Sequence, residues 1–210
     1  MKGSPLFRCF LLLALALVLP VVRTQAQVAP DNQLTSDELA SRFLAQATFG
    51  PSPAAITELR GLNYDFNAWI DREVAKPATL SAPLATAALA AGQVTAINNA
   101  VNRRARNEVM IGGNDQLRQR VAYALSQIFV ISDNVSTIAN ANEGSCGYYD
   151  MLAQGAFGSF RDLLMNVTRH PMMGRFLSHY RNRKANPGTG TRPDENYARE
   201  VMQLFTIGLY

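Results

Sequence analysis

Apolar residues recur at helical spacing along almost the whole chain, and this periodicity restricts the possible folds more than any other feature. Leu39, Phe43 and Leu44 share one helical face, and Thr35 with Glu38 forms a capping box in front of them. We see neither the apolar–polar alternation of a substantial sheet nor a long internal repeat. The sequence therefore predicts a mostly α fold, a multi-helix globular domain with long loops.

Start and stop signals divide this pattern into separate helices. We expect helices after Thr35, over 52–61 and 64–73, in the alanine-rich stretch 78–100, from Asn114 or Asp115 to Phe129, three times between Tyr148 and Tyr180, and from Asp194. The helix near 115–129 carries an apolar stripe of Leu117, Val121, Leu125, Ile128 and Phe129, and we expect it to be a central core helix. The polar stretches 132–147 and 181–193 are expected to be loops.

The first 26 residues have the three parts of a secretory signal peptide: a short basic region, the apolar run 9–19 and a small-residue exit. Cleavage is expected between Ala26 and Gln27. A membrane anchor is the alternative, but a span needs about 20 apolar residues and Pro20 interrupts the run. We expect export by the general secretory route to the periplasm or the medium, with no transmembrane anchor after processing.

The expected organisation is a signal peptide (1–26), an N-terminal segment with the start of the first helix (27–40) and a helical domain (41–210). Three basic residues leave with the leader, so 17 basic residues remain against 16 acidic ones. This balance gives no support for nucleic-acid binding. Cys146 is the one cysteine left, so stability must come from a core rather than an internal disulfide.

The stretch from residue 179 to residue 200 holds the best candidate site, because a basic loop leads into a helix N-terminus. Backbone amides and arginine forks at such a place can hold oxyanions or sugars. The ligand-binding candidates are His179, Arg181, Arg183, Arg192, Asp194 and Asn196, and the weak catalytic candidates are Glu195 and Glu200. The plainer interpretation is a solvated loop, with Asp194 as N-cap and Glu195 paired with Arg199.

Other site chemistry finds little support in the sequence. His170 and His179 are the two histidines, and neither belongs to a zinc-binding pattern. No nucleophile motif occurs, and Cys146 has no histidine near it in sequence. We expect neither a metal nor a cofactor.

Four segments resemble a known bacterial family. They are SRFLAQATFG at 41–50, LRQRVAYALSQIF at 117–129, YYD at 148–150 with FRDLL at 160–164, and PDENYAREVMQLFTIGLY at 193–210. Together and in this order they resemble the domain of unknown function 1800 family, and the last segment is the most specific.

The resemblance implies an exported, largely helical protein with no established reaction, in a family often encoded beside other exported proteins. It also implies a longer chain, because members continue past the last motif. Leu204, Phe205, Ile207, Leu209 and Tyr210 make the terminus apolar, where complete domains more often end in a polar tail. We therefore expect the sequence to be the N-terminal part of a C-terminally truncated domain.

Two functions of different class remain open. The first is an envelope or secreted scaffold that binds a surface polymer or another exported protein through the loop 181–193. The second is an exported hydrolase of envelope or extracellular polymer, with Glu195 or Glu200 as acid or base.

Overall fold

The computed structural model describes residues 35–139 and 143–208. These residues form helices joined by loops, and the only β pairing among them is an isolated bridge between Asn186 and Thr191. The predicted mostly α fold is confirmed. No helix of the described part has the length and apolarity to span a membrane. The predicted leader and its cleavage site at Ala26 and Gln27 lie outside the described residues.

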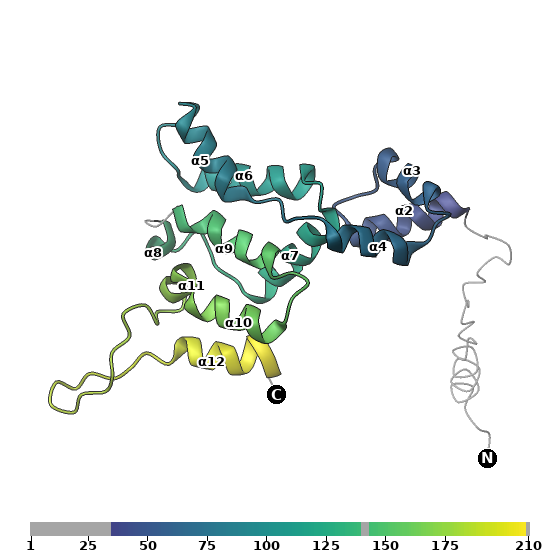
Figure 1. The fold of residues 1–210 in the computed structure, drawn as a ribbon. Helices are drawn as coiled ribbons and strands as arrows, with labels where there is room; N and C mark the ends of the chain where they lie inside the picture. Colours follow the sequence, from purple (N-terminus) through teal and green to yellow (C-terminus); the bar gives the residue numbers. More distant parts are fainter. Residues whose placement is uncertain (1–34, 140–142, 209–210) are drawn as a thin grey trace, which may run out of the picture. The chain divides into compact units, whose positions relative to one another are not determined.

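The first three helices of the described residues are α2 (Ser36–Ala47), α3 (Pro53–Gly61) and α4 (Phe66–Ala75), which appear in blue in Figure 1. Their starts follow the sequence signals, because Thr35 and Glu38 form the capping box and the Ser52 side chain accepts from a backbone amide of α3. Their shared core consists of Ala40, Leu44, Leu59 and Trp69.

The alanine-rich stretch is not one helix as predicted for 78–100. It contains α5 (Ser81–Ala90) and a turn, and its last two residues begin α6 (Asn99–Gly112), most of which was not predicted. The break has two local causes. Gly92 adopts a positive φ of 67°, and the Asn98 side chain accepts from the amides of Ala100 and Val101 to begin a new helix.

Helix α7 (Gln116–Ile128) is central as predicted, since it packs against α2, α4, α6 and α9. The predicted apolar stripe makes up only part of its buried surface, however, since Phe129 is fully buried and Leu117 and Leu125 are partly buried against the core clusters. Gln119, Ala122 and Ser126 are buried, whereas Ile128 is 43% exposed. Small and polar side chains therefore take part in the helix contacts beside the apolar stripe, and the hydrophobic pattern alone does not predict this.

The prediction of a loop over 132–147 is wrong in its middle and at its C-terminal end. A short helix α8 spans Ser136–Ala139, and α9 (Glu143–Gln154) starts well before Tyr148. Ser145 and Cys146 are fully buried, and the Ser145 hydroxyl donates to the Asp133 carboxylate at 3.1 Å. Burial of these small residues compensates for their weak helix propensity. Helix α9 packs against α5, α6, α7, α10 and α11.

The remaining helices are α10 (Phe160–Arg169), α11 (Pro171–Phe176) and α12 (Asn196–Met202), followed by the π-helix η1 (Gln203–Ile207). They close the largest core cluster, which includes Phe129, Tyr148, Tyr197 and Phe205. The final helix starts two residues later than predicted, at Asn196. Because the π-helical turn changes the helical phase, Leu204 is 57% exposed instead of facing the core.

Candidate functional site

The predicted binding loop, 181–193, joins α11 to α12 and extends away from the helices as an open hairpin (Figure 1). Near its tip, the Asn186 amide donates to the Thr191 carbonyl at 3.0 Å. At its base, the Asn182 side chain donates to the Asp194 carbonyl at 2.7 Å and accepts from the Asp194 amide at 2.9 Å. This two-bond clasp fixes the distance between the two ends of the loop.

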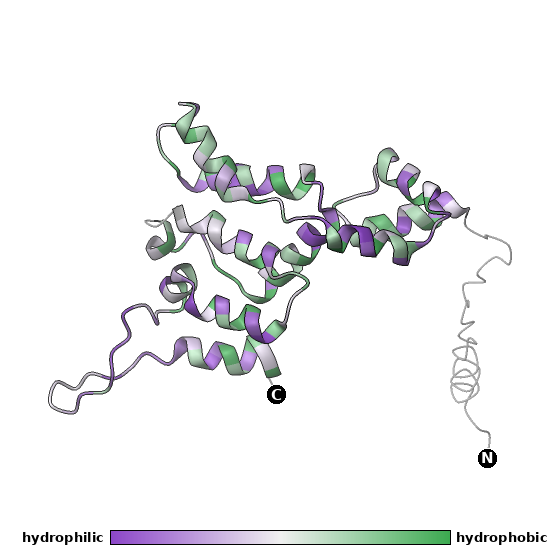
Figure 2. Ribbon diagram, viewed as in Figure 1, coloured by the Kyte–Doolittle hydropathy of each residue, from purple (hydrophilic) through white to green (hydrophobic). Residues whose placement is uncertain are grey.

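The basic side chains of the loop point into solvent. Arg181, Arg183, Lys184 and Arg192 are all exposed, and none forms an ion pair with another described residue. The Arg181 guanidinium carbon lies 5.1 Å from the centre of the Tyr180 ring. Figure 2 shows the hydrophilic character of the loop in purple and white. Its positive charges therefore remain available to a partner.

The acidic candidates next to the loop have local roles. The Asp194 carboxylate accepts from the Asn196 amide at 2.9 Å, and Glu195 forms an ion pair with Arg199 at 2.8 Å while staying 80% exposed. The N-cap residue of the helix is Glu195 rather than the predicted Asp194, and Glu195 makes no side-chain capping bond. This geometry fits the plainer interpretation, in which Asp194 and Glu195 belong to the helix start, better than a catalytic role for Glu195.

His179 lies apart from the exposed cations. Its Nε2 donates to the Thr168 carbonyl over 3.0 Å, and its ring centre is 4.2 Å from that of Tyr197. The Tyr197 hydroxyl is 2.6 Å from the Thr168 hydroxyl, and burial raises the pKa of Tyr197. His179 thus packs α12 against α10 and does not present its ring with the arginines of the loop.

Two buried polar atoms in this region have no hydrogen-bond partner among the described residues. They are Nδ1 of His179 and Oε2 of Glu200. Of the weak catalytic candidates, Glu200 is thus the one with a sheltered oxygen, whereas Glu195 is solvated. The structure does not bring Glu195 and Glu200 together as a paired acid and base.

Three buried carboxylates that the sequence reading passed over tie helices together. Asp150 accepts from the Ser81 amide and hydroxyl at 2.7 Å each and from the Ala82 amide at 2.8 Å, so that α9 caps the start of α5. Glu73 accepts from the first turn of α7, and Asp115 accepts from the amide of Thr79. Each carboxylate therefore has a structural role, although Oδ1 of the fully buried Asp115 has no hydrogen-bond partner among the described residues.

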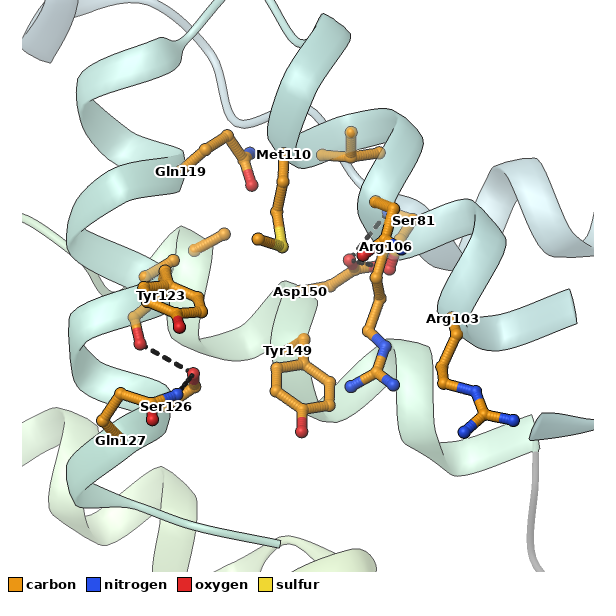
Figure 3. Close-up of a pocket in the computed structure, with 14 residues that line it drawn as sticks. Ser81, Arg103, Arg106, Met110, Gln119, Tyr123, Ser126, Gln127, Tyr149 and Asp150 are labelled. Carbon is orange, nitrogen blue, oxygen red and sulfur yellow. Dashed lines mark hydrogen bonds between the residues drawn. The ribbon is translucent and has the colours of Figure 1, made fainter. Parts of the chain in front are cut away.

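A pocket of about 280 Å³ lies between α6, α7 and α9 (Figure 3). Arg106, on α6, forms an ion pair with Asp133 at 2.9 Å, and both side chains are nearly buried. Its guanidinium carbon lies 4.0 Å from the centre of the Tyr149 ring. Burial raises the pKa of Tyr149, although the nearby Arg106 opposes this shift. The pocket therefore has a fixed cation on an aromatic wall.

The sequence held a signal for this pocket that was missed. Arg103, Arg106, Asn107 and Met110 are spaced at i, i+3, i+4 and i+7, so they share one face of α6, and all four line the pocket. The sequence analysis predicted no helix over most of α6, so these four residues could not be placed on one face.

Metal and thiol chemistry gain no support. Within 35–139 and 143–208, no group of three histidine, cysteine or carboxylate side chains is placed to hold a metal ion. Cys146 is buried, its thiol lies 3.2 Å from Asn102 Oδ1, and burial raises its pKa. A buried thiol with a raised pKa is a poor nucleophile.

Comparison with protein families matches residues 42–210 to the family described as "Protein of unknown function (DUF1800)". The chain belongs to the DUF1800 family. The match covers both the basic loop and the pocket, so both lie in the DUF1800 part of the chain. Searches of curated proteins and of solved structures found no match.

Proposed function

We propose that this DUF1800 chain is an exported, non-catalytic binding protein that holds an anionic surface polymer through the loop 181–193. The observation that carries the proposal is the set of four exposed cations on that loop, which have no carboxylate partner among the described residues. Surface cations are usually solvated, and a single pair contributes about 0–1 kcal/mol. Four on one hairpin, however, can contact successive charges of a polymer.

The conformation of the loop supports this use of the charges. The Asn182 clasp and the Asn186–Thr191 bridge hold the hairpin in shape, so less conformational entropy is lost when a ligand binds. The acids beside it do not neutralise the arginines, because Asp194 faces a backbone amide and Glu195 faces Arg199.

Export is the second part of the proposal, and it rests on the leader sequence. A polymer of the cell surface is accessible only to a protein that leaves the cytoplasm. Mass spectrometry of the protein recovered from the periplasm or medium should give an N-terminus at Gln27. A folded product in the cytosol that retains Met1 would contradict export.

The binding test uses a charge-matched pair of variants. Arg181, Arg183, Lys184 and Arg192 are all replaced by Gln in one variant, and Arg42, Arg72, Arg104 and Arg161, which are exposed and unpaired among the described residues, are replaced by Gln in the other. Both lose four positive charges. We expect the loop variant to lose retention on an isolated envelope fraction and the control to keep it. Equal retention of the two variants would rule out the loop.

The hydrolase is the second candidate, and the buried, unpartnered Oε2 of Glu200 is the observation that favours it. A sheltered carboxyl oxygen can act as an acid or base, whereas the exposed Glu195 is paired with Arg199. If this candidate holds, Glu200→Gln stops release of sugars or acids from envelope polymer and Glu195→Gln does not. Equal activity of both variants would exclude Glu200 from catalysis.

A further inference from the structure

The pocket between α6, α7 and α9 shares no residue with the loop of the proposed polymer binding and has the features of a separate ligand site. We propose that it binds a small organic acid with one planar ring, whose carboxylate meets the arginines of α6 and whose ring lies between the two tyrosines. The site and the ligand class follow from the charge, the walls and the size of the pocket.

The charge of the pocket favours an anion. Arg103 is exposed at the pocket and forms no ion pair with a described residue, and Arg106 keeps a buried Nε–H that has no acceptor there. Asp150 is the one acid among the described lining residues, and its two oxygens already accept three hydrogen bonds from Ser81 and Ala82. A ligand carboxylate would supply the counter-charge that Arg103 lacks, beside the guanidinium group of Arg106.

The geometry of Arg106 is fixed before any ligand arrives. Its Nη2 donates to Asp133 at 2.9 Å, and its guanidinium group stacks over Tyr149. Asp133 is in turn held by the Ser145 hydroxyl. A guanidinium group held in this way loses little side-chain entropy on binding, so the pocket is prepared for an oxyanion.

The remaining walls suit a flat apolar body. Figure 3 shows the rings of Tyr123 and Tyr149 on different sides of the pocket, with the Met110 side chain reaching in from α6. Ala122 and Ala153 leave space where larger side chains would fill it. A volume of about 280 Å³ accommodates one substituted ring and is too small for most drug-sized ligands.

A sugar is the competing ligand, because Gln119, Gln127 and the tyrosines could serve its hydroxyl groups. The unpaired charge of Arg103, beside the guanidinium group of Arg106, favours the acid. The experiment therefore compares benzoate with its neutral counterpart benzyl alcohol and with glucose, by titration calorimetry and ligand-observed NMR on the mature chain.

We expect benzoate to bind saturably with an affinity in the millimolar range or tighter, and benzyl alcohol and glucose to bind at least tenfold more weakly. Arg103→Gln should weaken benzoate binding about tenfold. The neighbouring exposed Arg104 does not line this pocket, so Arg104→Gln should leave binding unchanged. Ala122→Leu, which fills the pocket, should abolish binding while the circular dichroism spectrum stays helical.

Four results of the binding measurements, and one further result with Ala122→Leu, would overturn the inference. They are the absence of saturable benzoate binding, equal binding of benzyl alcohol, stronger binding of glucose, and equal losses in the Arg103 and Arg104 variants. Binding that survives Ala122→Leu with the fold intact would place the ligand elsewhere and would also overturn it. Retention on the envelope fraction depends on a different set of residues, so failure here leaves the loop proposal to its own test.

Discussion

The charged groups of the helical body and those of the loop 181–193 are used in opposite ways. In the body, Glu73, Asp115 and Asp150 are buried and each accepts hydrogen bonds from another segment of the chain. In the loop, the cations are exposed and unpaired among the described residues. The difference indicates that charge stabilises the fold in the body and remains available for binding in the loop.

The largest effect should follow from Asp150→Ala. The change leaves the amides of Ser81 and Ala82 and the Ser81 hydroxyl without their acceptor inside the fold, which should cost about 3 kcal/mol or more. Urea denaturation followed by Trp69 fluorescence measures the loss. The matched change Asp71→Ala, at an exposed site on α4, should cost less than about 0.5 kcal/mol. Similar losses in both variants would contradict the role given to Asp150.

A smaller loss is expected for Tyr148→Phe in the main core. The buried Tyr148 hydroxyl donates to the Phe129 carbonyl at 2.8 Å, and removing it leaves a buried acceptor, at a cost of about 1–2 kcal/mol. Tyr180→Phe is the control, because Tyr180 is exposed and keeps its ring contacts with arginine. Thermal unfolding should separate the two variants; equal midpoints would show that the Tyr148 hydrogen bond adds nothing.

Asn182→Ala should distinguish the local stability of the loop 181–193 from the global stability of the helical body. The change removes the clasp on Asp194, so amide exchange in 181–193 should speed up, while global stability falls by less than about 1 kcal/mol. Retention on the envelope fraction should fall severalfold. Asn166→Ala, at an exposed site on α10, serves as the control. Unchanged exchange in the loop would show that the clasp does not hold it.

The smallest effect is a pH dependence in the body. Burial lowers the pKa of His170, whose Nδ1 accepts from the Met172 amide at the start of α11. The unfolded chain takes up this proton near the ordinary value of 6.5, before the folded chain does, so the stability contribution is present above pH 6.5 and is lost as the pH falls below it. Denaturation midpoints between pH 7.5 and 5 should decline, and the decline should flatten in His170→Gln. Identical pH profiles would refute this role.

The sequence predicted helices best where local signals decide the structure. The capping box at Thr35 and the cap at Ser52 mark α2 and α3, because these interactions lie within a few residues. The predictions were wrong where contacts between residues far apart in the sequence decide the structure. Helix α9 starts among weak helix formers because Ser145 and Cys146 are buried by other helices. Gln119 and Ser126 are buried for the same reason.

The same distinction applies to the candidate site, whose local features could be predicted from the sequence and whose packing contacts could not. The exposure of Arg181 and Arg183 could be predicted from a polar, glycine-containing loop. The pocket could be predicted only in part, because the face shared by Arg103 and Arg106 is visible in the sequence, whereas its meeting with Tyr149 depends on how α6 and α9 pack. His179 was grouped with the loop by sequence proximity, but its contacts are with Thr168 and Tyr197.

The most direct test of this division measures stability and binding on the same protein. The variant with Gln at positions 181, 183, 184 and 192 is compared with the unchanged mature chain in urea denaturation and in salt-dependent retention on the envelope fraction. We expect free energies of unfolding that agree within about 0.5 kcal/mol. The unchanged chain should be retained at low salt and released as the salt concentration rises, whereas the variant should not be retained even at low salt. A destabilised variant, or one retained as well as the unchanged chain, would contradict the assignment of stability to the body and binding to the loop.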